Sequence, residues 1–220
     1  MRFHEFGDLL LLDCDGVILN SNYIKIDSMR CALSDIEGIA EGVDEAVKYF
    51  TNNFGKSRFH HVEAFLNGIL SLQTEADKSC VERAILTKYA SNLDLSYKQA
   101  MVTEGFLDFL TALKIKKYVV SGSEQEQLRA VFSEKGLTSY FEEVFGSPIN
   151  KIELVSAILS KENPESPVLI GDSIADLNVA LELGIDFVAY TPYSNVAEEL
   201  VEEASRFGFP VLNNWAEVKV

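Results

Sequence analysis

The stretch LLLLDCDGVILNS, residues 9–21, decides the fold of this chain. Its unbroken apolar run predicts a strand over Leu9–Asp13 that is buried on both faces, as in a parallel sheet covered by helices. Asp13 and Asp15 stand one residue apart, and Gly16 follows them. Neighbouring carboxylates repel each other, and burial raises their pKa values unless a cation or hydrogen bonds compensate. The stretch therefore predicts either a solvated turn or a site that holds positive charge.

The chain is long enough for one sizeable core, or for a core domain with a small inserted one. It has 220 residues, of which 47% are hydrophobic and 24% charged, and this is typical of a soluble globular protein. No apolar stretch approaches the roughly 18 residues that a membrane span needs. The apolar run near the start is too short for a signal peptide. We expect a cytoplasmic protein without a membrane partner.

Acidic residues outnumber basic ones by 34 to 19, which gives a net charge of −15. Such a surface repels phosphate backbones, so nucleic acid is not an expected partner. An anionic small molecule would bind only where a local cation reverses the field. The three cysteines include no CxxC pair and predict neither a disulfide framework nor a zinc site. The sequence leaves open whether the protein is a monomer or a homodimer.

Strand and helix patterns alternate after residue 105. Strands are predicted within residues 116–121, 141–147, 166–173 and 185–192, and helices over residues 124–135, 151–159 and 174–183. This alternation predicts a parallel sheet with helices on both faces. Residues 22–99 contain no proline and are typical of helices throughout. The expected fold is α/β, with a Rossmann-like, doubly wound core from residues 1–18 and 100–220 and a helical domain inserted at residues 19–99.

Polar residues accompany the ends of four predicted strands. Ligands of doubly wound sheets bind beyond the carboxyl ends of the strands, so the topology brings these residues to one edge. They are Asp13, Asp15 and Gly16 after the first strand, Ser121, Gly122 and Ser123 after the second, Lys151 in the helix after the third, and Gly171, Asp172, Ser173 and Asp176 after the fourth.

The carboxylates of this set suit phosphoryl transfer. Asp13 and Asp172 are able to share one Mg²⁺, which prefers carboxylate oxygens and bridges to phosphate. One carboxylate is then free to attack phosphorus. Asp15 is placed to act as general acid and then as general base.

The remaining polar groups suit the phosphate itself. Ser121 and the backbone N–H groups near Gly122 and Ser123 are placed to hold phosphate oxygens as substrate-binding groups. Lys151 would neutralise charge on the transferring group. Phosphoryl transfer depends mainly on such positioning and electrostatics.

Four motifs of the chain resemble those of the haloacid dehalogenase superfamily in order and spacing. They are DCDGV at residues 13–17, VVSGS at 119–123, Lys151, and GDSIAD at 171–176. The resemblance covers almost the whole chain, and the insert after the first motif is similar to the α-helical cap of the phosphatase and phosphomutase branch.

The resemblance implies a mechanism and a metal site. The intermediate would be an aspartyl phosphate on Asp13. Mg²⁺ would be held by Asp13, by the backbone carbonyl of Asp15 and by Asp172. Asp176 would either support the metal shell or orient Lys151.

The lysine motif departs from the common form of this branch, which carries prolines after the lysine. Here it is SPINKIELV, so Lys151 is assigned by its position after FGS, and Lys135 is the alternative. Within the insert, NNFGKSRFHHVEAF is similar to the substrate-specificity loop of these proteins. The resemblance implies that Lys56 and Arg58 face the substrate, and a guanidinium suits a carboxylate or second phosphate.

The histidines of that loop have a simpler interpretation. His60 and His61 are more typical of surface or helix-start positions than of ligands. We therefore do not include them among the expected site residues.

The leading interpretation is a Mg²⁺-dependent phosphatase that hydrolyses a small phosphorylated metabolite through a phosphoaspartate. A phosphomutase of the β-phosphoglucomutase type is the first alternative, because it carries the same motifs and returns phosphate to sugar. A dehalogenase is disfavoured, since that branch lacks the second aspartate that Asp15 supplies. A phosphonatase would need a cap lysine that forms a Schiff base, for which Lys56 is the candidate. The non-enzyme alternative is a binding protein with this fold.

Overall fold

The computed structural model describes residues 7–72 and 74–218. Residues 1–6 and 219–220 of the predicted core domain, and Gln73 of the predicted helical domain, lie outside the described residues. The strands are β1 (Leu9–Leu12), β2 (Leu19–Asn20), β3 (Met101–Val102), β4 (Lys116–Glu124), β5 (Glu143–Ser147), β6 (Pro167–Gly171), β7 (Asp186–Tyr190) and β8 (Val211–Leu212). The α-helices are α1 (Asn22–Ser34), α2 (Val43–Asn52), α3 (Arg58–Ala64), α4 (Glu75–Gln99), α5 (Phe106–Ala112), α6 (Gln125–Glu134), α7 (Lys151–Glu162), α8 (Ile174–Leu183) and α9 (Ala197–Arg206).

The strand β1 lies in the middle of a parallel sheet with the order β5-β4-β1-β6-β7-β8. It pairs with β4 on one side, where Leu12 is in register with Val119, and with β6 on the other, where Leu12 is in register with Ile170. The short strands β2 and β3 pair antiparallel and bracket the helices α1 to α4 in the sequence. Because the strands of the large sheet are parallel, their carboxyl ends meet at one edge.

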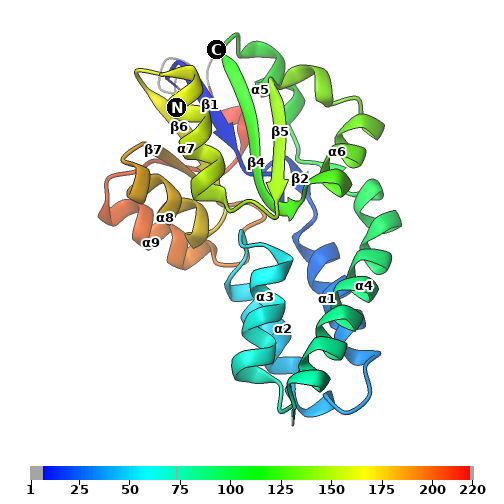
Figure 1. The fold of residues 1–220 in the computed structure, drawn as a ribbon. Helices are drawn as coiled ribbons and strands as arrows, with labels where there is room; N and C mark the ends of the chain where they lie inside the picture. Colours follow the sequence, from blue (N-terminus) through cyan, green and yellow to red (C-terminus); the bar gives the residue numbers. More distant parts are fainter. Residues whose placement is uncertain (1–6, 73, 219–220) are drawn as a thin grey trace.

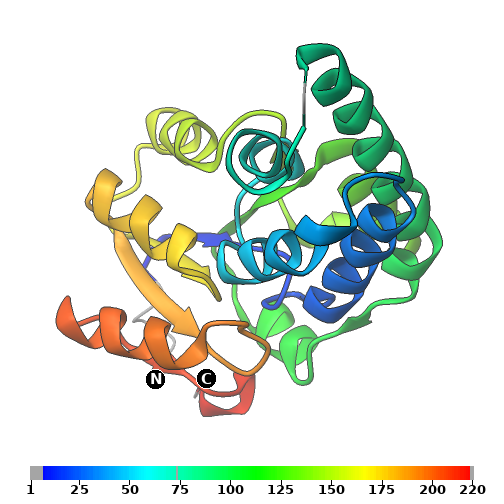
Figure 2. The same cartoon turned by 90° about the horizontal axis from the view of Figure 1, so that it is seen from below.

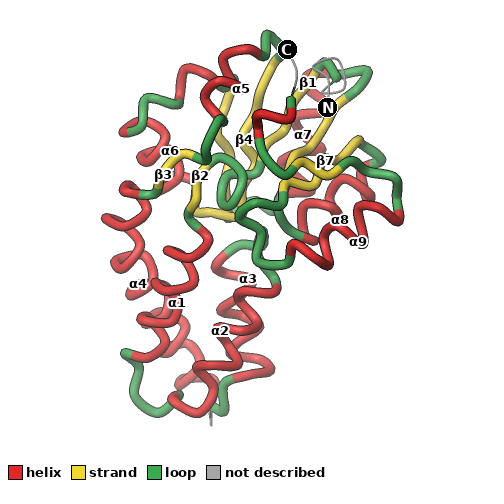
Figure 3. Tube along the Cα trace, turned by 180° about the vertical axis from the view of Figure 1, so that it is seen from behind, coloured by secondary structure: helices red, strands yellow, loops and turns green. Residues whose placement is uncertain are grey.

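The four leucines of β1 are buried because both faces of the sheet are covered. Successive side chains of a strand point to opposite faces. Leu9 and Leu11 pack with α7, α8 and α9, whereas Leu10 and Leu12 pack with α5, α6 and Trp215. Figure 3 shows the strands, in yellow, between these two helical layers. The continuous apolar run thus reflects burial on both sides.

The helices α1 to α4, residues 22–99, form what we call the helical segment. They lie beyond the carboxyl ends of the strands (Figures 1 and 2). The helix α1 packs against α2 and α4, and a capping box of Thr74 and Asp77 sets the start of α4. The apolar side chains of the segment are continuous with the core under α5 and α6. The segment therefore covers the edge of the sheet where the predicted site residues lie.

The expected α/β fold with a parallel sheet is confirmed. The helix expected over residues 174–183 has these bounds, whereas the one expected over 151–159 continues to Glu162. The strand expected to end at Ser121 continues to Glu124 past an irregularity in its pairing with β5. The division into two domains at the stated boundaries stays a prediction. No described helix combines the length and hydropathy that crossing a membrane requires.

Candidate active site

The carboxyl ends of the central strands bring the predicted site residues together. Asp13 follows β1, Ser121 lies near the end of β4, and Asp172 follows β6. Lys151 and Asp176 come from the first turns of α7 and α8. All five are buried, and the three aspartates are at most 2% exposed. The convergence expected from the topology is therefore observed for these residues.

Lys151 is held between two carboxylates. Its ammonium donates to Asp13 Oδ1 over 2.6 Å and also to Asp176 Oδ1. Asn150 caps α7 by accepting from the N–H of Glu153, which fixes the helix start that carries Lys151. Burial alone would lower the pKa of Lys151, but the two carboxylates raise it above its ordinary value. Lys151 is therefore a permanent cation beside Asp13.

Asp176 orients this lysine. One of its carboxylate oxygens accepts from Lys151, and the other accepts from the hydroxyl of Ser173 over 2.6 Å. The same hydroxyl caps α8 by accepting from the N–H of Asp176 over 3.2 Å. Of the two roles that the resemblance implies for Asp176, these hydrogen bonds favour the orientation of Lys151.

Asp172 keeps one carboxylate oxygen without a hydrogen-bond partner among the described residues. Its Oδ2 accepts from the amide of Asn22 over 2.7 Å, while Oδ1 is buried and unpaired. Gly16 permits this approach, because its φ is 80° and a Cβ there would overlap Asp172 Oδ2. Carboxylate oxygens of Asp13, Asp172 and Asp176 lie within 4.8 Å of one another.

A hard divalent cation fits this cluster. Mg²⁺ prefers carboxylate ligands, and Asp172 Oδ1 offers it an unpaired oxygen. Burial, together with the charges of Asp13 and Asp176, raises the pKa of Asp172 well above its ordinary value. Burial likewise raises the pKa of Asp13 to about 7, and Lys151 opposes that shift. A bound cation would relieve this repulsion.

The raised pKa of Asp13 predicts an unusual dependence of stability on pH. The folded group, with a pKa of about 7, holds its proton more tightly than the unfolded group at 3.8. The free energy of unfolding of the metal-free protein should therefore fall as pH rises between these values. Mg²⁺ competes with protons for the same carboxylates, so it should raise the melting temperature by several degrees more near pH 8 than near pH 5.

Thermal unfolding with Mg²⁺ or with EDTA, at both pH values, measures this effect. The matched control is Asp172→Asn, which keeps the shape of the side chain and removes the charge. It should abolish most of the Mg²⁺-dependent shift. An equal shift at both pH values in the unmodified protein would contradict binding at this cluster.

Asp15 points away from the acid cluster into a second network. Its Oδ1 accepts from the hydroxyl of Ser21 over 2.6 Å, and its Oδ2 accepts from the hydroxyl of Ser123 over 2.6 Å and from the ammonium of Lys25. Burial acts to raise the pKa of Asp15, but the Lys25 ion pair and these hydrogen bonds outweigh it and lower the pKa. The side chain of Asp15 is thus committed to this network, which leaves its backbone carbonyl for the implied metal role.

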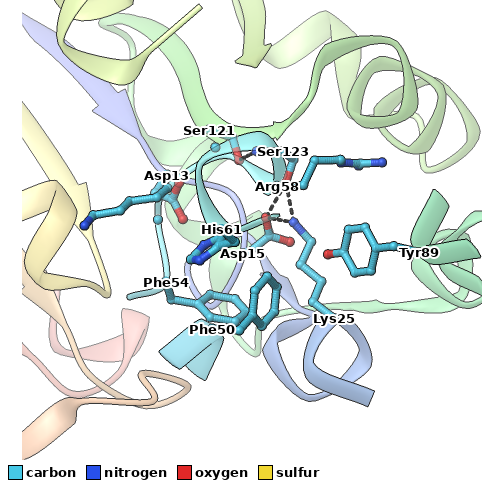
Figure 4. Close-up of a pocket in the computed structure, with 13 residues that line it drawn as sticks. Asp13, Asp15, Lys25, Phe50, Phe54, Arg58, His61, Tyr89, Ser121 and Ser123 are labelled. Carbon is cyan, nitrogen blue, oxygen red and sulfur yellow. Dashed lines mark hydrogen bonds and ion pairs between the residues drawn. The ribbon is translucent and has the colours of Figure 1, made fainter. Parts of the chain in front are cut away.

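The two networks meet at a small cavity between the sheet edge and the helical segment. Its volume is about 30 Å³, room for a water or two. Figure 4 shows the labelled residues around it: Asp13, Asp15, Ser121 and Ser123 from the sheet edge, and Lys25, Phe50, Phe54, Arg58, His61 and Tyr89 from the helical segment. A larger cavity of about 280 Å³ adjoins it, shares Gly55, Lys56 and Gly122 with it and is also lined by Lys151.

The loop before α3 lies directly on the predicted phosphate-binding turn. A Cβ on Gly122 would come within 2.6 Å of the carbonyl oxygen of Gly55 and 2.7 Å of that of Lys56. The close approach therefore depends on glycine at position 122. Ser57 follows as the cap of α3 and accepts from the N–H of His60 over 3.2 Å.

The two cations of this loop differ in placement. Arg58 is buried, donates to Gln127 of α6 over 2.7 Å and lies over the ring of Tyr89. Its Nε has no hydrogen-bond partner among the described residues, so the guanidinium retains a free donor. The side chain of Lys56 is exposed, and its ammonium lies 3.3 Å from Asn53 Oδ1. Only Arg58 buries its charged group beside the cavity in the way the resemblance implies.

The remaining predicted residues divide between the site and the rest of the molecule. Ser121 lines the cavity, and its Oγ accepts from the N–H of Ser123 over 3.2 Å. The hydroxyl of Ser123 itself donates to Asp15 Oδ2. Lys135, the alternative to Lys151, donates instead to the carbonyl of Lys98, on the far end of α4.

Two features of the site were not predicted. Lys25 and Asn22 lie three residues apart in the first turn of α1 and bind Asp15 and Asp172. Their spacing places them on one helix face next to the first motif, which is the one signal in the sequence. His61 is at a helix start as expected, but it is only 1% exposed, so the surface interpretation is wrong for it. Burial lowers the pKa of His61 to about 3, so its ring is neutral.

The fold and the site define an α/β protein with a carboxylate and lysine centre at the carboxyl ends of its strands. A family model of haloacid dehalogenase-like hydrolases matches residues 8–184, which is most of the chain. The chain belongs to this family, and the resemblance carried by its four motifs is confirmed. No curated protein matches the sequence.

Solved structures share this fold over nearly the whole chain. A protein described as a predicted phosphatase from Clostridium acetobutylicum is 17% identical, with a TM-score of 0.74 and 96% of each chain covered. A predicted phosphoglycolate phosphatase from Haemophilus somnus is 19% identical, with a TM-score of 0.71 and 96% of each chain covered. CbbY from Rhodobacter sphaeroides, solved with phosphate, is 16% identical, with a TM-score of 0.68, covering 96% of this chain and 95% of that one. At these identities the likeness shows the fold alone.

Proposed function

We propose that this hydrolase is a Mg²⁺-dependent phosphatase that acts on a small phosphorylated metabolite. The observation that carries the proposal is the separation of the two neighbouring aspartates into different environments. Asp13 lies in the acid cluster against Lys151, while Asp15 lies among hydroxyl and ammonium donors. Burial raises the pKa of Asp13, whereas the donors around Asp15 outweigh burial and lower its pKa. A cation held at the acid cluster would keep Asp13 ionised for attack, so the two carboxyls have the separate surroundings that divided nucleophile and acid/base roles require.

Asp13 is the proposed nucleophile. Its Oδ1 is held by Lys151, which leaves Oδ2 to attack phosphorus. A bond forms between Asp13 and phosphorus as the bond from phosphorus to the leaving oxygen breaks. Lys151 offsets the charge of the transferring group, and Ser121 with the turn at Gly122 faces its oxygens.

Asp15 is the proposed general acid and base. A phosphate dianion beside it would raise its pKa and favour the protonated form. Asp15 then gives its proton to the leaving oxygen. In the second half, Asp15 takes a proton from water, water oxygen bonds to phosphorus, and the bond to Asp13 breaks to release phosphate. Mg²⁺ held by Asp13 and Asp172 would neutralise phosphate charge in both halves.

Arg58 supports a substrate that carries a second anionic group. It is buried beside the cavity in a protein of net charge −15, and its Nε remains free to donate. Removing such a charge from water is costly unless it is paired. A carboxylate or a second phosphate on the substrate would complete that pairing.

The structure weighs against a phosphonatase. Its reaction needs an unprotonated lysine in the cavity to form a Schiff base. Lys56 lines the cavity, but its side chain is exposed and its ammonium lies by Asn53. Lys25 also lines the cavity, but Asp15 raises the pKa of Lys25 against the opposing effect of burial, so it stays protonated.

Release of inorganic phosphate from a panel of phosphorylated metabolites tests the proposed function. The panel should pair substrates with and without a second anionic group, and should include phosphoglycolate and sugar phosphates. We expect release from a narrow set with Mg²⁺ and none with EDTA. Transfer of phosphate to an added sugar phosphate in place of release would indicate a phosphomutase. A folded, Mg²⁺-loaded protein that releases phosphate from no member would contradict the proposal.

A further inference from the structure

The helical segment contributes a buried cation to the site that the four motifs do not include. Lys25, in the first turn of α1, is 6% exposed, and its ammonium contacts Asp15 and Ser123 and lies over the ring of Tyr97. Apolar residues such as Met29 and Leu33 already bury one face of α1. Burying an ammonium costs free energy unless a charged partner is present. Packing of α1 therefore does not explain why a lysine stands here.

The partners of Asp15 come from both parts of the molecule. Ser123 belongs to β4, whereas Ser21 and Lys25 stand at the start of α1. Together they occupy both carboxylate oxygens of Asp15. The orientation of this carboxylate thus depends on α1 lying against the end of β4. Figure 4 shows Lys25 reaching from α1 to Asp15 and Ser123.

The two hydroxyls do not determine this orientation by themselves. A serine hydroxyl rotates and both donates and accepts, so it adapts to several carboxylate positions. The ammonium only donates, and it joins Asp15 to Ser123 at the same time. Of the described groups that contact the Asp15 carboxylate, the Lys25 ammonium is the charged one, and it restricts the rotation of the Asp15 side chain. Acid/base catalysis requires that side chain within hydrogen-bond reach of the reacting oxygen.

We propose that Lys25 is a positioning residue that fixes Asp15 for proton transfer when the helical segment lies against the core. Lys25 acts through Asp15 and makes no bond to the phosphoryl group. Contact between α1 and the core thereby assembles the acid/base group beside the cavity. This inference rests on the proposed phosphatase function, since it assigns a role within that reaction.

Lys25→Met tests the role, because methionine retains the length and apolar stem of lysine without its charge. We expect kcat to fall by about 10²-fold while KM changes less than about threefold, since the loss concerns proton transfer and not binding. Lys25→Arg should keep at least a tenth of kcat, because it retains a cationic donor. The matched control is Lys48→Met, which changes an exposed lysine of α2.

A double-mutant cycle with Asp15→Asn separates positioning from general damage. If Lys25 acts only through Asp15, Lys25→Met should lower kcat no further in the Asp15→Asn background. Equal losses of kcat in both backgrounds would overturn the proposal. So would a rise in KM with kcat unchanged, which would mean that Lys25 binds the substrate.

The Lys25 variants and the unmodified protein together distinguish a folding defect from a loss of catalysis. If Lys25→Met does not fold, Lys25→Arg carries the test, and the proposal then requires it to fold and to retain activity. Unchanged kcat in folded Lys25→Met, beside an active unmodified protein, would overturn this inference alone. Absence of phosphate release from the unmodified protein would contradict the proposed function and this inference with it.

Discussion

Asp13→Asn should abolish turnover and leave the protein folded. The amide has the shape of the carboxylate but is not nucleophilic, so we expect kcat to fall by about 10⁴-fold or more. The substitution also removes one charge from the cluster of Asp13, Asp172 and Asp176, so the melting temperature measured with EDTA should stay level or rise. Phosphate release and thermal unfolding measure the two effects.

Acid quenching during turnover of a radiolabelled phosphate ester provides the direct control. The unmodified protein should carry acid-stable label on one aspartate, and Asp13→Asn should carry none. Retained turnover in the folded variant would remove Asp13 as the nucleophile. Loss of turnover also separates an enzyme from a binding protein with this fold, because binding alone does not require a nucleophile.

Lys151→Met should damage both stability and activity. The lysine is buried between Asp13 and Asp176, and its removal leaves those carboxylates without a counter-charge. Breaking a buried ion pair from one side costs about 3–5 kcal/mol, which lowers the melting temperature by roughly 10 °C in a chain of this size. We expect kcat to fall by about 10²- to 10³-fold, since Lys151 also offsets charge on the transferring group.

Two further variants make this result specific. Lys135→Met removes a half-buried lysine that donates to the carbonyl of Lys98, and it should leave kcat unchanged. Adding Asp176→Asn to Lys151→Met removes one of the stranded carboxylates, so it should restore part of the lost stability without restoring kcat. A Lys151→Met protein as active as the unmodified one would return Lys135 to consideration.

The sheet was predictable because strand burial leaves a local signal. Leu9–Leu12 and residues 167–171 are apolar without interruption, and they form adjoining central strands. Glycine and capping residues likewise set helix ends, as at Gly184 after α8. The helix α9 and the short strand β8 were not predicted. They lie at the edge of the sheet, where burial on one side gives a weaker pattern.

The site residues at strand ends were predictable for a similar reason. In a parallel sheet, a carboxylate directly after a buried strand lies at the edge where the carboxyl ends of the strands meet. This rule placed Asp13 and Asp172 at that edge. Asp15 was also expected there, but its separation from the acid cluster was not. That separation arises from donors on α1 and β4 that stand six to 108 residues away in the sequence.

The sequence by itself determined the α/β core, the polar residues that follow its strands, and the four motifs that these residues form. Only the tertiary structure decided which charges of the helical segment enter the site. Lys25 is buried against Asp15, whereas the side chain of Lys56, within the implied specificity loop, is exposed. Lys25 stands between Ile24 and Ile26, and Lys56 stands between Gly55 and Ser57, but these neighbours do not tell which lysine contacts a carboxylate. The difference comes from how the helical segment packs on the sheet edge, which depends on contacts between residues far apart in the chain.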